Sequence, residues 1–174
     1  GASLGTWTNT GSFMTGRIYH TANLLPNNNV LITGGRDADY FFSTCQLYNI
    51  STGTWTSTGS FENGRGYNTT ILLPNNKVMI AGGYDILGNY LSNAQLYDIT
   101  SGTWSSTGNL ITGRYNHNAT LLSNNNVLIT GGDDSITFTS TCELYNISTG
   151  TWTSTGSFET GRSYHNTILL PNNK

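Results

Sequence analysis

Short runs of apolar and β-branched residues alternate with clusters of turn-forming residues along the chain. Within residues 17–57 four such runs occur, at 19–25, 30–33, 45–49 and 54–57. Asparagine, glycine, serine and proline are frequent in the gaps, and these residues favour turns over strand interiors. No window shows the sustained period of an amphipathic helix. The pattern predicts units of four short antiparallel strands, with no helix longer than a turn or two.

This pattern returns at a nearly constant interval. Successive tryptophans are 48, 49 and 48 residues apart, at Trp7, Trp55, Trp104 and Trp152. A glycine and an arginine follow each of them, with the arginines at Arg17, Arg65, Arg114 and Arg162. Farther on come a glycine pair and a tyrosine, at Gly34-Gly35 and Tyr48, Gly82-Gly83 and Tyr97, and Gly131-Gly132 and Tyr145. Repeats of this length are typical of solenoids, propellers or arrays, and the strand-rich unit favours a propeller.

The repeated residues resemble the kelch repeat, a propeller blade with an arginine and histidine before its first strand and a glycine pair ending its second. A tyrosine in the third strand and a tryptophan in the fourth complete that pattern. Residues 80–85 (Ile-Ala-Gly-Gly-Tyr-Asp), 94–98 (Ala-Gln-Leu-Tyr-Asp) and 102–104 (Gly-Thr-Trp) fit it closely. The resemblance covers essentially the whole chain. It implies an all-β fold of kelch-type β-propeller blades, but it specifies function weakly because propellers host many activities.

The repeat period divides the single kelch-repeat segment, residues 1–174, into five parts. We expect an outer strand and connection at 1–16, blades at 17–64, 65–113 and 114–161, and an inner strand at 162–174. The ring is then incomplete, since propellers usually have about four to eight blades. A segment of a longer propeller is the favoured interpretation, and association of copies is the alternative. The number of blades in the complete propeller stays open.

Composition narrows the classes of partner. Charged residues make up 9% of the chain and the formal net charge is −2, so there is no basic surface to bind nucleic acid or an anionic membrane. No stretch approaches the roughly 20 apolar residues of a spanning helix, and the start shows no signal-peptide pattern. The compartment stays open, with an extracellular location slightly favoured over a cytoplasmic one.

Cysteines and glycosylation sequons do not settle the compartment either. Cys45 and Cys142 occupy equivalent third-strand positions two blades apart, beyond the ~7 Å between Cα atoms that a disulfide spans. We interpret both as small buried core residues. Four Asn-x-Ser/Thr sequons occur, no more than this asparagine-rich composition gives by chance, and their glycosylation stays open: Asn49, Asn68, Asn118 and Asn146.

Residues that recur in every unit are expected to build the fold. Tryptophan and tyrosine combine a large apolar area with a polar tip, which suits the seams between blades. Glycine pairs permit backbone conformations or close approaches that a Cβ would block. The arginine column is expected to make hydrogen bonds to neighbouring loops. Apolar side chains such as Leu24, Leu47 and Trp7 would lie uncovered on the sides of an unfinished ring.

Two catalytic or metal-binding alternatives deserve a test against the structure. A histidine follows three residues after the arginine in most units, at His20, His117 and His165, with Asn68 in the same place in the second unit. A ring of imidazoles could bind a metal, but histidine there belongs to the general kelch pattern. The pairs Tyr19-His20 and Tyr164-His165 are also similar to a copper-binding pair of galactose oxidase, whose other ligands cannot be identified here. We therefore expect no enzyme, no metal and no cofactor.

Variable loops identify the expected working face. In a four-stranded antiparallel blade, the loop between strands two and three lies on the side of the connection to the next blade. Those loops differ between the units, whereas the opposite turns are short and nearly identical. Variation on a constant scaffold is typical of binding residues. We expect a non-catalytic module that binds a protein or a glycan through Arg36, Asp37, Asp39, Tyr40, Phe41, Tyr84, Asp85, Asn89, Tyr90, Asp133, Asp134 and Phe138.

Two rival functions remain beside that expectation. One is a segment of a carbohydrate-active copper oxidase of the galactose oxidase type, and the other is a structural repeat unit that self-assembles through its exposed blade sides. The sequence does not name the ligand.

Overall fold

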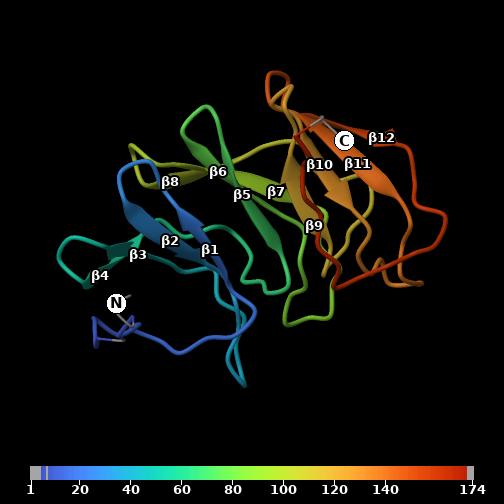
Figure 1. Ribbon diagram of the computed structural model, residues 1–174. Coiled ribbons are helices and arrows are strands. Elements are labelled where there is room, and N and C mark those ends of the chain that lie inside the picture. The colour runs from blue at the N-terminus through green and yellow to red at the C-terminus, as the bar shows by residue number, and fades with distance from the viewer. Residues whose placement is uncertain (1–4, 7, 172–174) are drawn as a thin grey trace.

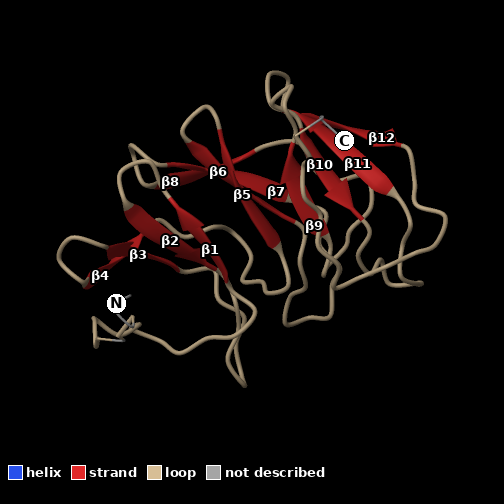
Figure 2. Cartoon of the chain, viewed as in Figure 1, coloured by secondary structure: helices blue, strands red, loops and turns tan. Residues whose placement is uncertain are grey.

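The computed structural model describes residues 5–6 and 8–171, and all of its regular structure is β-sheet (Figures 1 and 2). Twelve strands form three separate four-stranded antiparallel sheets. No helix occurs among the described residues, as the sequence predicts. Correspondingly, none of the described residues forms a helix long and apolar enough to cross a membrane.

Each sheet is a meander in which consecutive strands pair. The first contains β1 (Thr21–Leu24), β2 (Asn29–Thr33), β3 (Cys45–Asn49) and β4 (Thr54–Thr58) in that order. The second contains β5 (Thr69–Leu73), β6 (Lys77–Ala81), β7 (Ala94–Asp98) and β8 (Thr103–Ser106). The third contains β9 (Asn118–Leu121), β10 (Val127–Thr130), β11 (Cys142–Asn146) and β12 (Thr151–Thr155).

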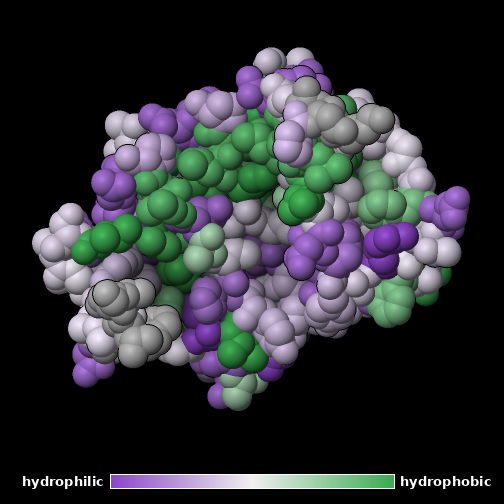
Figure 3. Space-filling view, in the orientation of Figure 1, coloured by the Kyte–Doolittle hydropathy of each residue, from purple (hydrophilic) through white to green (hydrophobic). Residues whose placement is uncertain are grey.

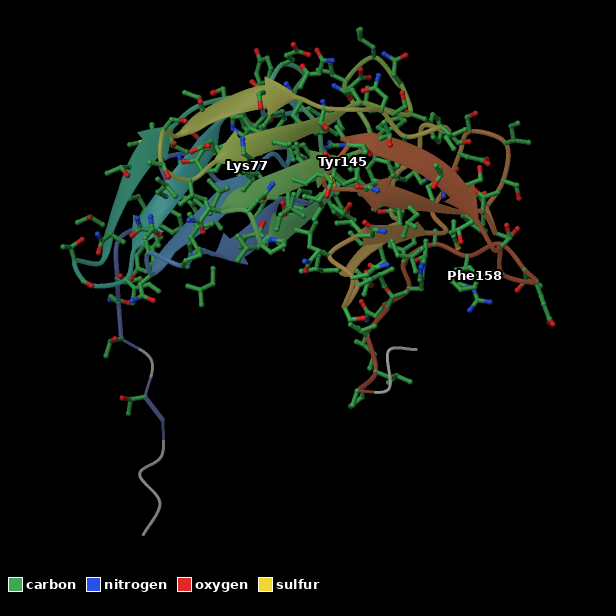
Figure 4. All side chains as sticks on the ribbon, turned by 90° about the horizontal axis from the view of Figure 1, so that it is seen from above. Lys77, Tyr145 and Phe158 are labelled. Atoms are coloured by element: carbon green, nitrogen blue, oxygen red, sulfur yellow. The ribbon has the colours of Figure 1, made fainter. Side chains whose placement is uncertain are left out.

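The register of the three sheets is the same. Tyr48 lies opposite Trp55, Tyr97 opposite Trp104, and Tyr145 opposite Trp152, so the repeated aromatic pair falls on one face of every sheet. Seen from above, the sheets follow one another along an arc, and β1, β5 and β9 are its inner strands (Figure 4). The fold is therefore an arc of three four-stranded propeller blades that does not close into a ring.

The hydrophobic core lies between the blades. One cluster joins Leu31 and Cys45 of the first sheet to Val78, Ile80 and Tyr97 of the second. Another joins the second sheet to the third through Met79, Ala81, Val127, Ile129 and Tyr145. Tyr145 is seen between these two sheets in Figure 4. Because each face is buried only by the next blade, a blade cannot complete its core alone.

The blade seams also carry the hydrogen bonds expected of tryptophan and tyrosine. The indole nitrogen of Trp104 donates to the carbonyl oxygen of Gly59 on the preceding blade, at 3.0 Å. The hydroxyl of Tyr97 lies 2.6 Å from that of Thr58, which ends β4. Trp152 and Tyr145 repeat both contacts at the next seam. The structural interpretation of these columns is thus confirmed, apart from Trp7, which lies outside the described residues.

Two further expectations for the core are met. Cys45 and Cys142 are both buried, and neither is in a disulfide. Burial raises the pKa of the Cys45 thiol to about 12 and also raises the pKa of Cys142. Both cysteines therefore stay protonated and act as small apolar core residues.

The flanking segments follow the sheets without forming regular strands. Around the first sheet, the described residues from 8 to 17 make one backbone hydrogen bond to it, from Gly11 to Gly53. Beyond the third sheet, residues 165–167 are held to β9 by the side chains of Asn118 and Thr120. A regular strand needs a continuous series of backbone hydrogen bonds to a neighbouring strand, and neither described segment makes one. The part boundaries drawn from the repeat period remain predictions.

Candidate functional site

The arginine column fixes the beginning of each blade. The guanidinium of Arg65 donates to the carbonyl oxygens of Gly82 and Asn93, both at 3.1 Å, and that of Arg114 donates to those of Gly131 and Thr141, both at 2.9 Å. Both arginines are fully buried. Burial lowers the pKa of Arg65 to about 10. These hydrogen bonds hold both ends of the variable loop in place, as the sequence predicts for the arginine column.

Glycine pairs connect one blade to the next at the same level. The second glycine of each pair donates its N–H at 2.8 Å to the carbonyl oxygen of the following arginine, through Gly35 to Arg65, Gly83 to Arg114 and Gly132 to Arg162. Gly35 has a φ of 90°, and a Cβ added to it would meet the carbonyl oxygen of Ile18 at 2.7 Å. Only glycine fits where three chain segments meet so closely.

Around the central axis, the residue two positions after each arginine adopts a left-handed conformation. Tyr19, Tyr67, Asn116 and Tyr164 have φ values of 55°, 58°, 52° and 53°. Each of the last three donates its N–H to the carbonyl oxygen of its counterpart one blade earlier, at 3.0–3.3 Å. Left-handed φ is uncommon for residues other than glycine, so a repeated one indicates a constrained position. We call these four residues the axial ring.

The variable loops lie on the same face as the axial ring. Isolated antiparallel bridges pair Ile18 with Arg36, Gly66 with Tyr84 and Tyr115 with Asp133. Each loop is then closed by a second bridge, from Arg36 to Phe41, Tyr84 to Tyr90 and Asp133 to Phe138. The first residue of every loop is therefore held from both sides. These loops project from rigid bases, as binding loops on a scaffold commonly do.

Aromatic side chains on this face form a continuous cluster across two blade boundaries. Tyr84 has ring centroids 6.2 Å from Phe41, 5.4 Å from Tyr90 and 5.3 Å from Tyr115. Tyr115 in turn lies 5.7 Å from Tyr67, whose ring stacks on Tyr19 at 4.0 Å. We call this set the aromatic belt: Tyr19, Phe41, Tyr67, Tyr84, Tyr90 and Tyr115.

Of the residues predicted for the site, the structure brings together Phe41, Tyr84 and Tyr90. Tyr40 and Phe138 are 65% and 56% exposed, and neither ring packs against another aromatic ring of the described residues. Sequence reasoning missed the other half of the belt. Tyr19 begins the run expected to form the first strand, and the sequence assigns no role to Tyr67 or Tyr115. Their common position, one or two residues after a framework arginine, was the signal that could have found them.

Acidic residues of the loops mainly shape the loops themselves. Asp85 is 8% exposed, and its carboxylate accepts the N–H groups of Leu87 and Asn89 and the side-chain amide of Asn89, all at 2.9 Å. Asp37 and Asp134 accept backbone N–H groups of their own loops in the same way. These hydrogen bonds lower the pKa of Asp37. Both oxygens of Asp85 are thus engaged within its own loop, whereas Asp37 and Asp134 accept these hydrogen bonds at Oδ1 alone.

The remaining predicted residues divide between loop structure and exposure. Arg36 donates to the carbonyl oxygen of Asp37 at 2.9 Å, and its guanidinium lies 5.2 Å from the ring centre of Phe41. Asp133 accepts a hydrogen bond from the hydroxyl of Tyr115 at 3.1 Å, which contributes, after burial, to a raised pKa of that tyrosine. Asp39 and Asn89 are exposed at the loop surface.

The residues present do not fit a copper site of the galactose oxidase type. Tyr164 is 75% exposed, and Nε2 of His165 lies 2.9 Å from the hydroxyl of Thr130. His117 makes the same contact with Thr69. Within the described part of the chain, no group of three or more histidine, cysteine or acidic side chains is arranged to hold a metal ion.

Comparison with known proteins agrees with this architecture. Residues 3–174 match the KLHDC2/KLHL20/DRC7 Kelch-repeats domain, so the chain belongs to the kelch-repeat family. Among solved structures, that of YjhT superposes with a TM-score of 0.76 at 14% sequence identity, over 91% of this chain. The chain spans 57% of the length of that structure. No curated protein sequence gave a significant match. At such low identity, the likeness to YjhT concerns the fold alone.

Proposed function

We propose that this chain is a non-catalytic interaction module that docks a partner protein on the face carrying the aromatic belt and the variable loops. Kelch-repeat membership supports an interaction role in general. The observation that supports it most directly is the aromatic belt, which links loop residues of two blades to the axial ring without interruption. Tyrosine and phenylalanine are enriched at interfaces because they bring large apolar area at a small entropic cost.

The distribution of polar groups supports a protein partner. Tyr40 and Phe138 stand exposed beside the belt, so a docking surface could extend to both of them. Asp39 and Asn89 lie exposed at its edge and suit the polar rim of a protein interface. A glycan that stacks on the same rings is the second candidate ligand, and the oxidase is disfavoured by the geometry of its expected ligands.

The experiment compares two sets of variants in pull-downs and on a glycan array. The loop set carries Tyr40→Ser, Tyr90→Ser and Phe138→Ser, and the turn set carries Asn28→Gly and Asn76→Gly on the opposite face. Asn28 and Asn76 both have a φ of 60°, which glycine adopts freely, so the turn set should keep the fold. We expect partner proteins to be retained by the turn set and lost by the loop set. The reverse result would overturn the site, and retention of glycans alone would favour the second ligand.

Self-association is proposed as a further property of the blade sides. Leu24 is 60% exposed on the first sheet, and Ile168 and Leu170 are 76% and 45% exposed beyond the third. Figure 3 shows hydrophobic side chains gathered in an arc across the face on which β1, β5 and β9 are seen. Contiguous apolar surface of more than a few hundred Å² usually drives association.

A further inference from the structure

A separate cavity of about 350 Å³ lies at the centre of the axial ring. Its walls come from all four segments that begin an inner strand, around positions 19–20, 67–68, 116–117 and 164–166. Every lining side chain is a tyrosine, a histidine or an asparagine. The variable loops contribute nothing to it, so this cavity is distinct from the loop part of the docking surface.

The buried polar groups of this cavity lack partners. Asn68 is only 6% exposed, yet neither its Oδ1 nor its Nδ2 makes a hydrogen bond. His117 is equally buried, and its Nδ1 is also unpartnered. Buried polar atoms are nearly always hydrogen-bonded in folded proteins, so each exception needs an explanation. A bound polar molecule would supply the missing partners on this wall.

The cavity carries no formal charge to attract an ion. Burial lowers the pKa of His117 to about 3 and also lowers the pKa of His165, so both imidazoles are neutral near pH 7. None of the lining side chains is an arginine or a lysine, and the guanidinium groups of Arg65 and Arg114 are directed to backbone carbonyls. No carboxylate lines the cavity either. Neither an anion nor a cation finds a counter-charge there.

The lining side chains instead combine three recognition elements. The side-chain amide of Asn68 offers a donor and an acceptor, and His117 and His165 each offer Nδ1, since their Nε2 atoms contact Thr69 and Thr130. Hydroxyl groups, which both donate and accept, suit such a set. Tyr19 and Tyr164 are 48% and 75% exposed and present aromatic rings at the rim. A flat apolar face beside paired donors and acceptors matches a sugar ring, which has C–H groups on its faces and hydroxyls around its edge.

We propose that the axial cavity binds a neutral sugar ring, either as a free monosaccharide or as the terminal residue of a glycan. Asn68 and His117 hold its hydroxyl groups, and Tyr164 packs against its face. The volume is within the range of small-molecule sites, about 300–1,000 Å³. Tyr19 and Tyr67 also belong to the aromatic belt, but Asn68, His117 and Tyr164 do not, so the cavity can be tested separately from the variable loops.

The test is an NMR titration of the full chain with glucose, galactose, mannose and N-acetylglucosamine, with glucuronate as the charged comparison. We expect saturable shifts with at least one neutral sugar and none with glucuronate. A glycan array then separates the two sources, since a terminal residue of a chain would bind there more tightly than the free sugar. Absence of saturable binding by every neutral sugar in both formats, or preference for glucuronate, would overturn the proposal.

Three variants locate the binding. Asn68→Leu should weaken it at least tenfold and leave the fold intact, since it removes two unpartnered polar atoms. Tyr164→Asn should weaken it several-fold, and the chain itself carries asparagine at the equivalent Asn116. If Asn68→Leu does not fold, Asn68→His replaces it. The other units carry histidine at this position, so the fold should accept it, and the imidazole cannot offer the sugar the same donor and acceptor pair as the amide. Unchanged affinity in these variants, with Tyr40→Ser as the loop control, would place the sugar elsewhere and refute the site.

Discussion

Arg114 and Glu143 form a buried ion pair, with 2.7 Å between Nη2 and Oε1 and side-chain exposures of 0% and 2%. The carboxylate also accepts the N–H groups of Ile111 and Thr112 from the preceding connection. One blade earlier, Gln95 takes the place of Glu143, and Nη2 of the buried Arg65 has no hydrogen-bond partner. Two units of one architecture therefore solve the same charge problem differently.

Glutamate at position 95 should stabilise the fold, and glutamine at position 143 should destabilise it. Gln95→Glu supplies Arg65 with a carboxylate, and we expect it to raise the free energy of unfolding by about 1.5–3 kcal/mol, the range for hydrogen bonds to charged groups. Gln95 already accepts the N–H of Glu62, and a glutamate retains that acceptor. Glu143→Gln should lower stability by a similar amount. Urea denaturation checks both, and a destabilised Gln95→Glu variant would contradict the interpretation.

A second prediction concerns acid sensitivity at His117. Its ordinary pKa near 6.5 falls to about 3 because burial disfavours the imidazolium, and the positive charge of Arg114 adds to this. Between those values the unfolded chain takes up a proton that the folded chain refuses. Stability is therefore lost as the pH falls from about 6.5 towards 3, by at most about 1.4 kcal/mol per pH unit for one such group.

The variant His117→Asn should remove this part of the pH dependence. Asparagine is the residue that the second unit carries at the same position, Asn68, so the site tolerates its size. Free energies of unfolding measured at pH 7 and pH 5 should differ less in the variant than in the parent chain, by on the order of 1–2 kcal/mol. Equal differences in both chains would show that His117 is not the responsible group.

The strands could be predicted closely because period and turn chemistry agree. Residues 45–49 form β3 with the predicted bounds, and the run at 54–57 is one residue short of β4. The apolar run at 19–25 was too long, since β1 covers only Thr21–Leu24. Tyr19 begins the run in a left-handed conformation, and Leu25 pairs with Asn28 and Asn29 in the turn. The apolar run extends past both ends of β1, but the extended strand conformation of the backbone does not.

The site was less predictable than the fold. Loop variability pointed to the face that carries the aromatic belt, but the pairing of Tyr84 with Tyr115 depends on segments of two different blades meeting in space. The position of Tyr115 directly after Arg114 marks it as part of the repeat, but it does not tell which ring of the neighbouring blade it meets. Asp85 shows the opposite error, because an acidic residue in a variable loop was expected to be available and is instead buried by its own loop. Whether a loop side chain is free to meet a partner thus depends on the folded shape of its own loop as well as on contacts between blades.

A third prediction concerns association of the blade sides. Light scattering on the isolated chain should show oligomers or aggregates, because Leu24, Ile168 and Leu170 remain substantially exposed. The double variant Ile168→Ser and Leu170→Ser should shift the distribution towards monomer. Neither residue belongs to a strand, so the melting temperature should change little. A stable monomer of the parent chain at high concentration would contradict the prediction.

The last prediction joins the architecture to the docking face through the glycine before each arginine. A Cβ on Gly64 would overlap the backbone carbonyl of Phe41, well inside van der Waals contact. The backbone N–H of Arg65 then donates a hydrogen bond to the carbonyl oxygen of Phe42 in the loop, at 3.2 Å. Gly113 and Gly161 meet the carbonyls of Tyr90 and Phe138 in the same way. Each aromatic loop thus packs against the next blade at a position where glycine has no side chain to block it.

Gly64→Ala should therefore displace the loop that carries Phe41 and cost about 1–3 kcal/mol, since backbone atoms cannot yield as a flexible side chain would. Gly16→Ala is the matched control, because a Cβ there meets nothing within 4 Å, and its effect should stay within about 0.5 kcal/mol. Hydrogen exchange should be faster at residues 36–42 in the first variant only. If both variants behave alike, the loop is not anchored by this contact, and the aromatic belt owes its order to the side-chain packing of Phe41 on Tyr84 instead.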